Sequence, residues 1–194
     1  MHVPPKPHLP YEAWSLAVVQ PLYMEAWVET AEVEDIRGLR FLDVYRGVTS
    51  SSSSPFSFER GGGIGREVLG ADLPRTIFLR WQSLVEPQTY RVRLEIPESA
   101  RRLMLTQGES SVVPGRKHYR NTLLIGIAPG GKVVLWNDGV ALPRVEILRA
   151  QAEVGPPGPD LGQYGGRYVT LSESTKRYIQ EHGIPYGSWT LPDE

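Results

Sequence analysis

The sequence predicts a mainly β fold of the α+β class, with antiparallel β-sheets in a sandwich-like arrangement and two short helices. Residues 88–96 alternate between apolar and polar side chains, which is the pattern of a strand with one buried face. Two apolar runs, 122–127 and 132–136, flank Ala128-Pro129-Gly130-Gly131, a pattern typical of a hairpin. The chain also holds 20 Gly and 17 Pro, which suit short strands and many turns better than long helices.

The N-terminal third predicts three strands. Residues 14–19 form a short strand candidate that ends before Pro21. Residues 24–33 also contain Ala and Glu, which favour a helix, but Val28, Thr30 and Val33 favour a long strand. A turn at Arg37-Gly38 separates this segment from a third strand at residues 39–48.

A Ser- and Gly-rich stretch follows these strands. Residues 49–55 are almost entirely Ser, and residues 61–65 are mostly Gly, so the composition predicts a mobile loop that buries little. Residues 1–10 predict a Pro-rich tether and residues 11–194 one β-rich domain, with a possible internal boundary in the 49–66 loop. Phe56 and Phe58 lie inside this loop, where they either pin it to the core or wait for a partner.

The second half has more regular patterns. In residues 76–83 one face carries Ile77, Leu79, Trp81 and Ser83. Pro97 ends the alternating strand at 88–96 and opens a short helix at 98–106. Residues 145–148 predict a further strand. Thr170 and Glu173 have the spacing of a capping box, which predicts a helix that runs to about His182 and ends at Gly183 and Pro185.

Several classes of chemistry lack the residues they need. The chain has no Cys, which excludes disulfides, iron–sulfur clusters and a Cys nucleophile, and its net charge of −1 argues against a nucleic-acid binder. Gly126 to Lys132 has the spacing of a phosphate loop, but Val133 replaces the Mg²⁺-binding hydroxyl and a strand follows. The four His are scattered, and there is no nucleophile elbow. We therefore predict no catalytic residue, no cofactor, no metal site and no enzyme activity.

Charge is distributed unevenly along the chain. Residues 1–36 carry six acids and one base, whereas residues 91–120 carry seven bases and three acids. These segments either face one another, lie in solvent, or form a protein interface that steers an oppositely charged partner. On the interface hypothesis, the candidate partner-binding residues are the acids of the second strand and the two loop aromatics: Glu25, Glu29, Glu32, Glu34, Asp35, Phe56 and Phe58.

Two motifs in the second half give the chain a resemblance to a family. Trp81-Gln82-Ser83-Leu84-Val85-Glu86 has the pattern W-x-S-L-x-E, and residues 128–136 have the pattern A-P-G-G-x-V-x-x-W. Together with Pro10 to Trp14 and Met24 to Glu29, they resemble a bacterial domain-of-unknown-function family, number twenty-nine thirty-one. The resemblance extends over residues 10–153.

That resemblance implies a function. Members are typically lipoproteins of Gram-negative bacteria, and several resemble immunity proteins encoded beside type VI secretion phospholipase effectors. We therefore expect a periplasmic immunity protein, anchored to the membrane only through a lipid, whose partner is a cognate lipase effector. The sequence departs from the family in having no signal peptide and no lipobox Cys, so Met1 is expected to replace the lipidated Cys or to begin a truncated chain.

Two other functions stay open. An envelope lipoprotein with a small-ligand pocket in its β core would show an apolar cavity with few polar groups. An uncharacterised envelope hydrolase would instead bring two carboxylates together in a deep pocket.

Overall fold

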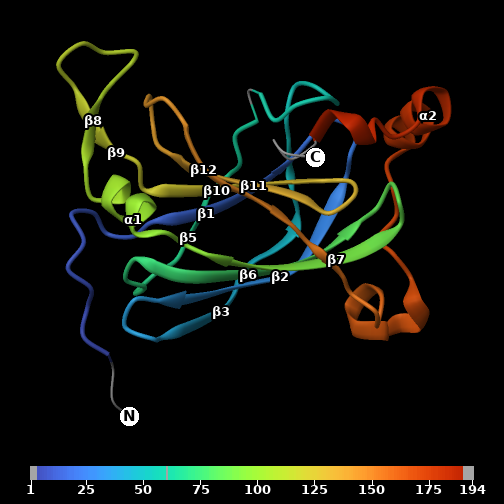
Figure 1. The fold of residues 1–194 in the computed structure, drawn as a ribbon, viewed down its shortest axis with the longest axis horizontal. Coiled ribbons are helices and arrows are strands. Elements are labelled where there is room, and N and C mark those ends of the chain that lie inside the picture. Colours follow the sequence, from blue (N-terminus) through green and yellow to red (C-terminus); the bar gives the residue numbers. More distant parts are fainter. Residues whose placement is uncertain (1–3, 60, 190–194) are drawn as a thin grey trace.

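A computed structural model describes residues 4–59 and 61–189 and confirms the mainly β architecture (Figure 1). The strands are β1 (Ser15–Gln20), β2 (Ala26–Asp35), β3 (Arg40–Val48), β4 (Ser50–Ser51), β5 (Arg66–Glu67), β6 (Pro74–Ser83), β7 (Gln88–Glu95), β8 (Gln107–Glu109), β9 (Lys117–Tyr119), β10 (Thr122–Ala128), β11 (Lys132–Asp138), β12 (Val145–Gln151) and β13 (Glu153–Val154). The helices are α1 (Glu98–Met104) and α2 (Glu173–His182), with short 3₁₀ turns at Pro159–Gly162 (η1), Tyr164–Gly166 (η2) and Tyr186–Trp189 (η3).

The larger strands form two sheets. The first has the order β12-β11-β10-β1-β4, with β5 also paired to β1, and the second has the order β13-β7-β6-β2-β3. Pairing in the second sheet is antiparallel throughout, as predicted, but in the first sheet β1 runs parallel to both β10 and β4. A parallel pair needs a long crossover, and here the chain between β1 and β10 supplies most of the second sheet.

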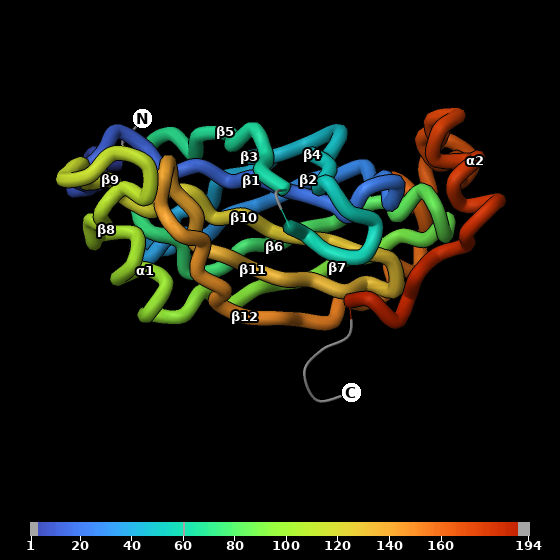
Figure 2. The backbone as a smooth tube through the Cα atoms, turned by 90° about the horizontal axis from the view of Figure 1, so that it is seen from above, coloured from blue at the N-terminus to red at the C-terminus, as the bar shows by residue number. Residues whose placement is uncertain are grey.

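The two sheets pack face to face around one core. Figure 1 shows the two sheets as stacked layers, and Figure 2 shows α2 at one end of the molecule and α1, β8 and β9 at the other. The alternation that predicted β6 and β7 also predicted the buried side, since Ile77, Leu79 and Trp81 are at most 1% exposed. Facing them from the first sheet lie buried side chains of β1, β10 and β11: Leu16, Val18, Leu123, Ile125, Ile127, Val133 and Leu135.

The Ser- and Gly-rich loop buries more than its composition predicted. Ser52 is buried, and β4 pairs with the end of β1. A Cβ at Gly61 would lie 2.6 Å from Cγ2 of Val19, and a Cβ at Gly63 would lie 2.8 Å from Cβ of Ala17. The glycines therefore let the loop backbone lie directly on the outer face of β1. Both sheets combine strands from before and after this loop, so the two halves share one core.

Two terminal features differ from expectation. Helix α2 is present, but its N-cap is Ser172, whose hydroxyl accepts from the backbone N–H of Thr175, so the predicted capping box at Thr170 is wrong. The 3.6-residue period does not fix a helix start to within two residues, and Ser172 is held by Glu25. In the predicted tether, the Pro5 carbonyl accepts a 2.7 Å hydrogen bond from Arg37, and Leu9 packs against the core. Residues 1–3 lie outside the described part.

Candidate functional site

Glu25, directly before β2, holds the start of α2. Its carboxylate accepts hydrogen bonds from the Ser172 backbone N–H at 3.0 Å, from the Ser172 hydroxyl, and from the Thr175 hydroxyl at 2.7 Å. Partial burial favours the neutral acid, but these hydrogen bonds outweigh it and lower the pKa of Glu25. The carboxylate therefore binds a distant segment of its own chain.

Glu29 lies at an irregularity in the pairing of β2 with β6 and is 2% exposed. Its Oε2 lies 2.6 Å from Nε of Arg80, and its Oε1 accepts hydrogen bonds from the Asp160 backbone N–H at 2.6 Å and from Gln82 Nε2 at 3.2 Å. A buried carboxylate needs such partners. Glu29 thus binds η1 to the outer face of the second sheet.

Gln82 and Thr89 extend this buried polar contact. They lie opposite each other on β6 and β7, and both are at most 1% exposed. The Val169 backbone N–H donates to Gln82 Oε1 at 3.0 Å, while the Thr89 hydroxyl donates to the Gly155 carbonyl at 2.9 Å. Together with Glu29 they form a polar row (Glu29, Gln82 and Thr89) that holds residues 155–169 at three points. Sequence reasoning did not single out Gln82 or Thr89.

Asp35 ends β2 and is completely buried. Its Oδ1 accepts from the backbone N–H groups of Arg37 at 2.9 Å and Leu39 at 3.1 Å. Its Oδ2 accepts from Arg37 Nε at 2.9 Å, from Arg37 Nη2 at 2.6 Å and from the Asp72 backbone N–H at 3.0 Å. Burial alone would raise its pKa, but these donors more than offset it and lower the pKa of Asp35. Asp35 therefore fixes the β2–β3 turn.

Glu32 and Glu34 point to the surface. Glu32 forms a 2.7 Å ion pair with Arg40, and Glu34 forms a 3.3 Å ion pair with Arg75. The structure thus separates the five acids that the sequence grouped together. Glu29 and Asp35 are buried in this structure, and Glu25 is hydrogen-bonded to the start of α2, so a partner-binding role for these three acids stays a prediction that their present contacts do not favour. A partner-binding role for Glu32 and Glu34 stays a prediction.

Phe56 and Phe58 line an open groove of about 410 Å³ over the outer face of the first sheet. Phe58 packs edge-on against Trp136, with ring centroids 5.4 Å apart, while Phe56 is 55% exposed. The guanidinium carbon of Arg144 lies 5.3 Å from the centroid of the Trp136 ring. We call the set Phe56, Phe58, Trp136, Arg144 and Trp189 the aromatic groove. Phe58 therefore pins the loop, whereas Phe56 is presented to solvent.

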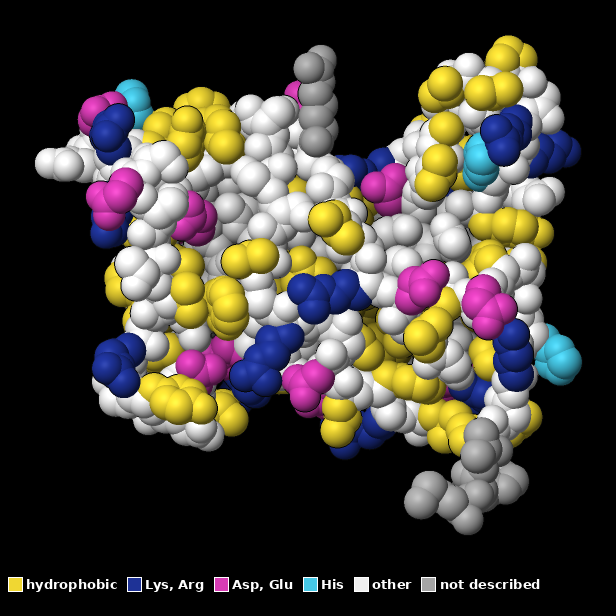
Figure 3. All heavy atoms as spheres, turned by 180° about the vertical axis from the view of Figure 1, so that it is seen from behind, with side chains coloured by type: hydrophobic (Ala, Val, Ile, Leu, Met, Phe, Trp, Pro, Cys, Tyr) yellow, Lys and Arg dark blue, Asp and Glu magenta, His cyan; other side chains and the backbone are white. Residues whose placement is uncertain are grey.

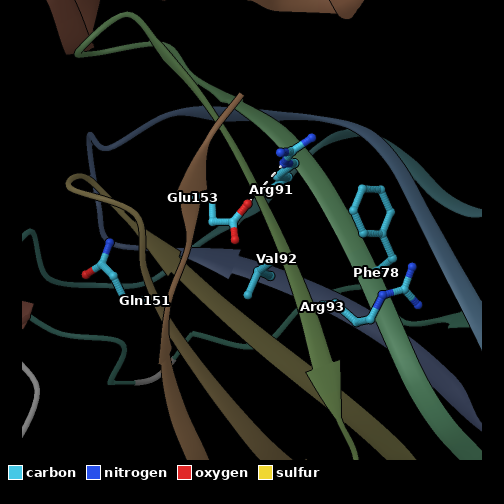
Figure 4. A pocket seen from close by; sticks show the side chains of 6 residues that line it. All are labelled: Phe78, Arg91, Val92, Arg93, Gln151 and Glu153. Atoms are coloured by element: carbon cyan, nitrogen blue, oxygen red, sulfur yellow. Dashed lines mark hydrogen bonds and ion pairs between the residues drawn. The ribbon is translucent and has the colours of Figure 1, made fainter. Parts of the chain in front are cut away.

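A second groove, of about 380 Å³, lies beside β7 (Figure 4). Arg91 and Arg93 come from the polar side of the alternating strand; Arg91 forms a 3.3 Å ion pair with Glu153, and the guanidinium carbon of Arg93 lies 5.6 Å from the Phe78 ring centroid. Arg93 also lines a smaller hollow beside Glu32 and Glu34, so at this place part of the basic segment lies next to the acidic strand.

The two sequence motifs meet at Glu86. Its Oε1 accepts hydrogen bonds from the Gly130 backbone N–H at 2.9 Å, the Tyr90 hydroxyl at 2.9 Å and the Tyr186 hydroxyl at 3.0 Å. A Cβ at Gly131 would lie 2.9 Å from the Tyr90 ring, so the second glycine lets the hairpin tip approach β7. Burial and the neighbouring Glu86 raise the pKa of Tyr186 to about 12, so it stays a hydrogen-bond donor. The motifs thus join the β10–β11 turn to the β6–β7 turn and to the C-terminal segment.

Other features of the surface are mixed. Figure 3 shows hydrophobic, basic and acidic side chains interspersed over the face opposite to that of Figure 1. Among residues 4–59 and 61–189, no three His, Asp or Glu side chains are placed to hold a metal ion together. Within the same described residues, no helix is both long and apolar enough to cross a membrane.

Comparisons with known proteins give one match. Searches of curated proteins and of solved structures found no significant similarity. The model of the family described as "Protein of unknown function (DUF2931)" matches residues 1–187, which is nearly the whole chain. A hydrogen bond from Gly130 to Glu86 joins the two sequence motifs, and the match covers the strands of both sheets. The chain therefore belongs to the DUF2931 family.

Proposed function

We propose that this protein is an immunity protein that binds and neutralises a type VI secretion antibacterial lipase effector in the periplasm, where a lipid anchors it to the membrane. Family membership supports the proposal through the resemblance described above. The observation that carries it is the aromatic groove, because it combines an exposed Phe56 with ordered aromatic and arginine side chains. Aromatic residues and Arg are the side chains that most often dominate protein interfaces.

The groove is ordered before any partner arrives. Phe58 is fixed against Trp136, and a Cβ at Gly126 would lie 2.7 Å from that indole, so the strand beneath leaves room only for the present packing. Arg144 is held by the Gly61 carbonyl and by Asp138 at 3.3 Å. Side chains that are already fixed lose little entropy on association, which favours tight binding.

The experiment is an inhibition assay with the lipase encoded by the neighbouring gene. The full chain is titrated into the lipase on phospholipid vesicles, and stoichiometric loss of hydrolysis together with a stable complex is expected. Phe56→Ala is expected to weaken binding by about ten-fold or more if the groove is the contact surface. Val112→Ala is the matched control, since Val112 is 73% exposed in the distant β8–β9 loop.

Absence of both binding and inhibition by the unmodified chain would contradict the proposal. If the Phe56→Ala and Val112→Ala variants bind the lipase equally well, the aromatic groove is not part of the interface, although the immunity function itself could still stand. The anchoring part is tested separately, by labelling cells that express the complete gene with a fatty-acid analogue and asking whether the membrane fraction contains the labelled protein.

A further inference from the structure

A pocket of about 310 Å³ lies where the end of β1, the start of β2, the end of β3 and the segment before α2 meet. Its volume is at the small end of the range of about 300–1,000 Å³ for ligand pockets, so it suits a ligand with a single ring. Its wall combines polar Gln20 and Glu25 with apolar Trp27, Val48 and Leu84. Within the described part of the chain, it shares no lining residue with the aromatic groove, so it is a separate place for a ligand.

The side-chain amide of Gln20 supplies a free donor to this pocket. Gln20 is only 5% exposed, and its Oε1 accepts hydrogen bonds from the Ala26 backbone N–H at 2.8 Å and from the Thr49 hydroxyl. Because a backbone N–H can only donate, this contact fixes which end of the amide is the oxygen. The other end, Nε2, has no hydrogen-bond partner among residues 4–59 and 61–189, yet it still reaches solvent. A ligand acceptor in the pocket would satisfy this donor, which a nearly buried amide otherwise leaves unpaired at a cost.

Glu25 supplies an acceptor to the same pocket. A carboxylate accepts about four hydrogen bonds, and three are in use: the Ser172 backbone N–H on Oε2, and the hydroxyls of Ser172 and Thr175 on Oε1. Oε2 therefore retains room for one more donor, such as a ligand hydroxyl. No Arg or Lys is found in the described lining, so the negative charge of Glu25 disfavours an anionic ligand.

The remaining wall is apolar. Trp27 is half-buried and pairs with Val48 across β2 and β3, while Leu84 is 7% exposed. A Cβ at Gly47 would lie 3.9 Å from Cη2 of Trp27, so the glycine leaves the indole room beside β3. An apolar surface next to one donor and one acceptor fits a ring that has a C–H face and hydroxyl groups at its edge, because each hydroxyl can both donate and accept.

We propose that this pocket binds a neutral pyranose sugar. A hydroxyl or acetamido oxygen of the sugar accepts from Gln20 Nε2, a neighbouring hydroxyl donates to Glu25 Oε2, and the C–H face of the ring lies against Trp27. A cationic amine is a poorer match, since an ammonium group would pair with Glu25 but offers no acceptor to Gln20. The site is additional to the proposed immunity function and does not rest on it.

The test is an NMR titration of the isotope-labelled full chain with methyl glucoside and with N-acetylglucosamine. Saturable shifts of the Gln20 side-chain NH₂ and Trp27 indole signals are expected, with a dissociation constant in the millimolar range because a one-ring ligand makes few contacts. Glucuronate should bind at least about five-fold more weakly than methyl glucoside, since its carboxylate meets Glu25. The site is overturned if neither neutral sugar gives a saturable change, or if glucosamine binds more tightly than both.

Two variants locate the bound sugar. Gln20→Glu keeps an oxygen for the Ala26 N–H but replaces the free donor, and it should weaken sugar binding about ten-fold or more. Gln163→Glu is the matched control, because it makes the same chemical change at an exposed position outside the described lining. Trp27→Leu keeps an apolar wall without the flat ring and should weaken binding about three-fold or more.

Urea midpoints of all three variants show whether each is folded. If Gln20→Glu does not fold, Trp27→Leu still tests the site on its own. Sugar binding that is unchanged in the folded variants would place the sugar elsewhere on the protein and overturn the inference.

Discussion

Replacing Asp35 by Asn isolates the energetic role of one buried carboxylate. The change keeps the shape of the side chain but replaces one oxygen by an NH₂ donor. Oδ1 can still accept from the Arg37 and Leu39 backbone N–H groups. The three donors that now reach Oδ2, namely Arg37 Nε and Nη2 and the Asp72 N–H, would instead face a second donor.

The burial of the Asp35 and Arg37 side chains determines how much unfolding free energy the substitution removes. The carboxylate of Asp35 is fully buried and the Arg37 side chain is 22% exposed, so Arg37 regains only part of its hydration when its partner disappears. Removing one member of a buried ion pair costs about 3–5 kcal/mol, and partial exposure places this case near about 3 kcal/mol. That is a large fraction of a typical free energy of unfolding of about 5–15 kcal/mol.

At acidic pH the difference in unfolding free energy between the parent protein and the Asp35→Asn variant should become smaller. The folded-state pKa of Asp35 lies below its unfolded value of about 3.9, so the unfolded chain binds more protons as the pH falls through this range. The stabilisation by Asp35 is therefore complete above about pH 5 and is lost as the pH falls through the lowered folded-state pKa. The unfolding free energies of the two proteins should therefore converge as the pH falls from about 3.9 through the lowered folded-state pKa of Asp35.

Urea unfolding followed by Trp fluorescence measures both effects. At pH 7 the midpoint of Asp35→Asn should fall by about 1–3 M, given a loss of about 3 kcal/mol and urea slopes of about 1–3 kcal/mol per M. Glu34→Gln is the control, because its 3.3 Å ion pair with Arg75 lies at the surface, with both side chains partly exposed, and should contribute only about 0–1 kcal/mol. Equal losses in the two variants, or an Asp35→Asn loss that does not shrink in acid, would refute the reasoning.

Three further changes test other parts of the fold. Gly126→Ala places a Cβ 2.7 Å from the Trp136 ring. It should lower the free energy of unfolding by about 1–3 kcal/mol and shift the Trp fluorescence. A variant as stable as the parent protein would contradict that packing. Ser172→Ala should destabilise α2 by about 1 kcal/mol, measured by amide hydrogen exchange, whereas Thr170→Ala should leave the stability of α2 unchanged. A larger loss from Thr170→Ala than from Ser172→Ala would indicate that Thr170 is the N-cap after all. Leu135→Ala removes a fully buried side chain and should cost about 2–5 kcal/mol in urea unfolding, and a loss below about 1 kcal/mol would place Leu135 outside the core.

Local patterns predicted the elements and their buried faces. The alternation at residues 88–96 gave β7 and its inward side, and Val28, Thr30 and Val33 correctly favoured strand over helix in β2. The two-residue strands β4, β5 and β13 were missed, because each forms only by pairing with a strand elsewhere in the chain. The parallel pairing of β1 was missed for the same reason.

The roles of the acidic side chains could not be predicted from the strand that carries them. Glu29 and Thr89 look solvent-facing in their own strands, and they are buried only because residues 155–169 cover them. The partner of Glu29 lies 131 residues away in the sequence, beyond the range of any periodicity. The one sequence signal for this covering segment is the high glycine content of residues 155–166, which is typical of a backbone with positive φ angles.

The position of β1 has a consequence for how the protein is made. Ser15 pairs with Thr122, so β1, an interior strand of the first sheet, leaves the ribosome more than 100 residues before its neighbour β10. At about 5–20 residues per second, that delay is about 5–20 s. During it, β1 exposes apolar side chains on both faces, Leu16 and Val18 on one and Ala17 and Val19 on the other. Nascent chains of this protein therefore cannot complete the first sheet until β10 has emerged, and the apolar side chains of β1 stay without their β10 neighbours until then.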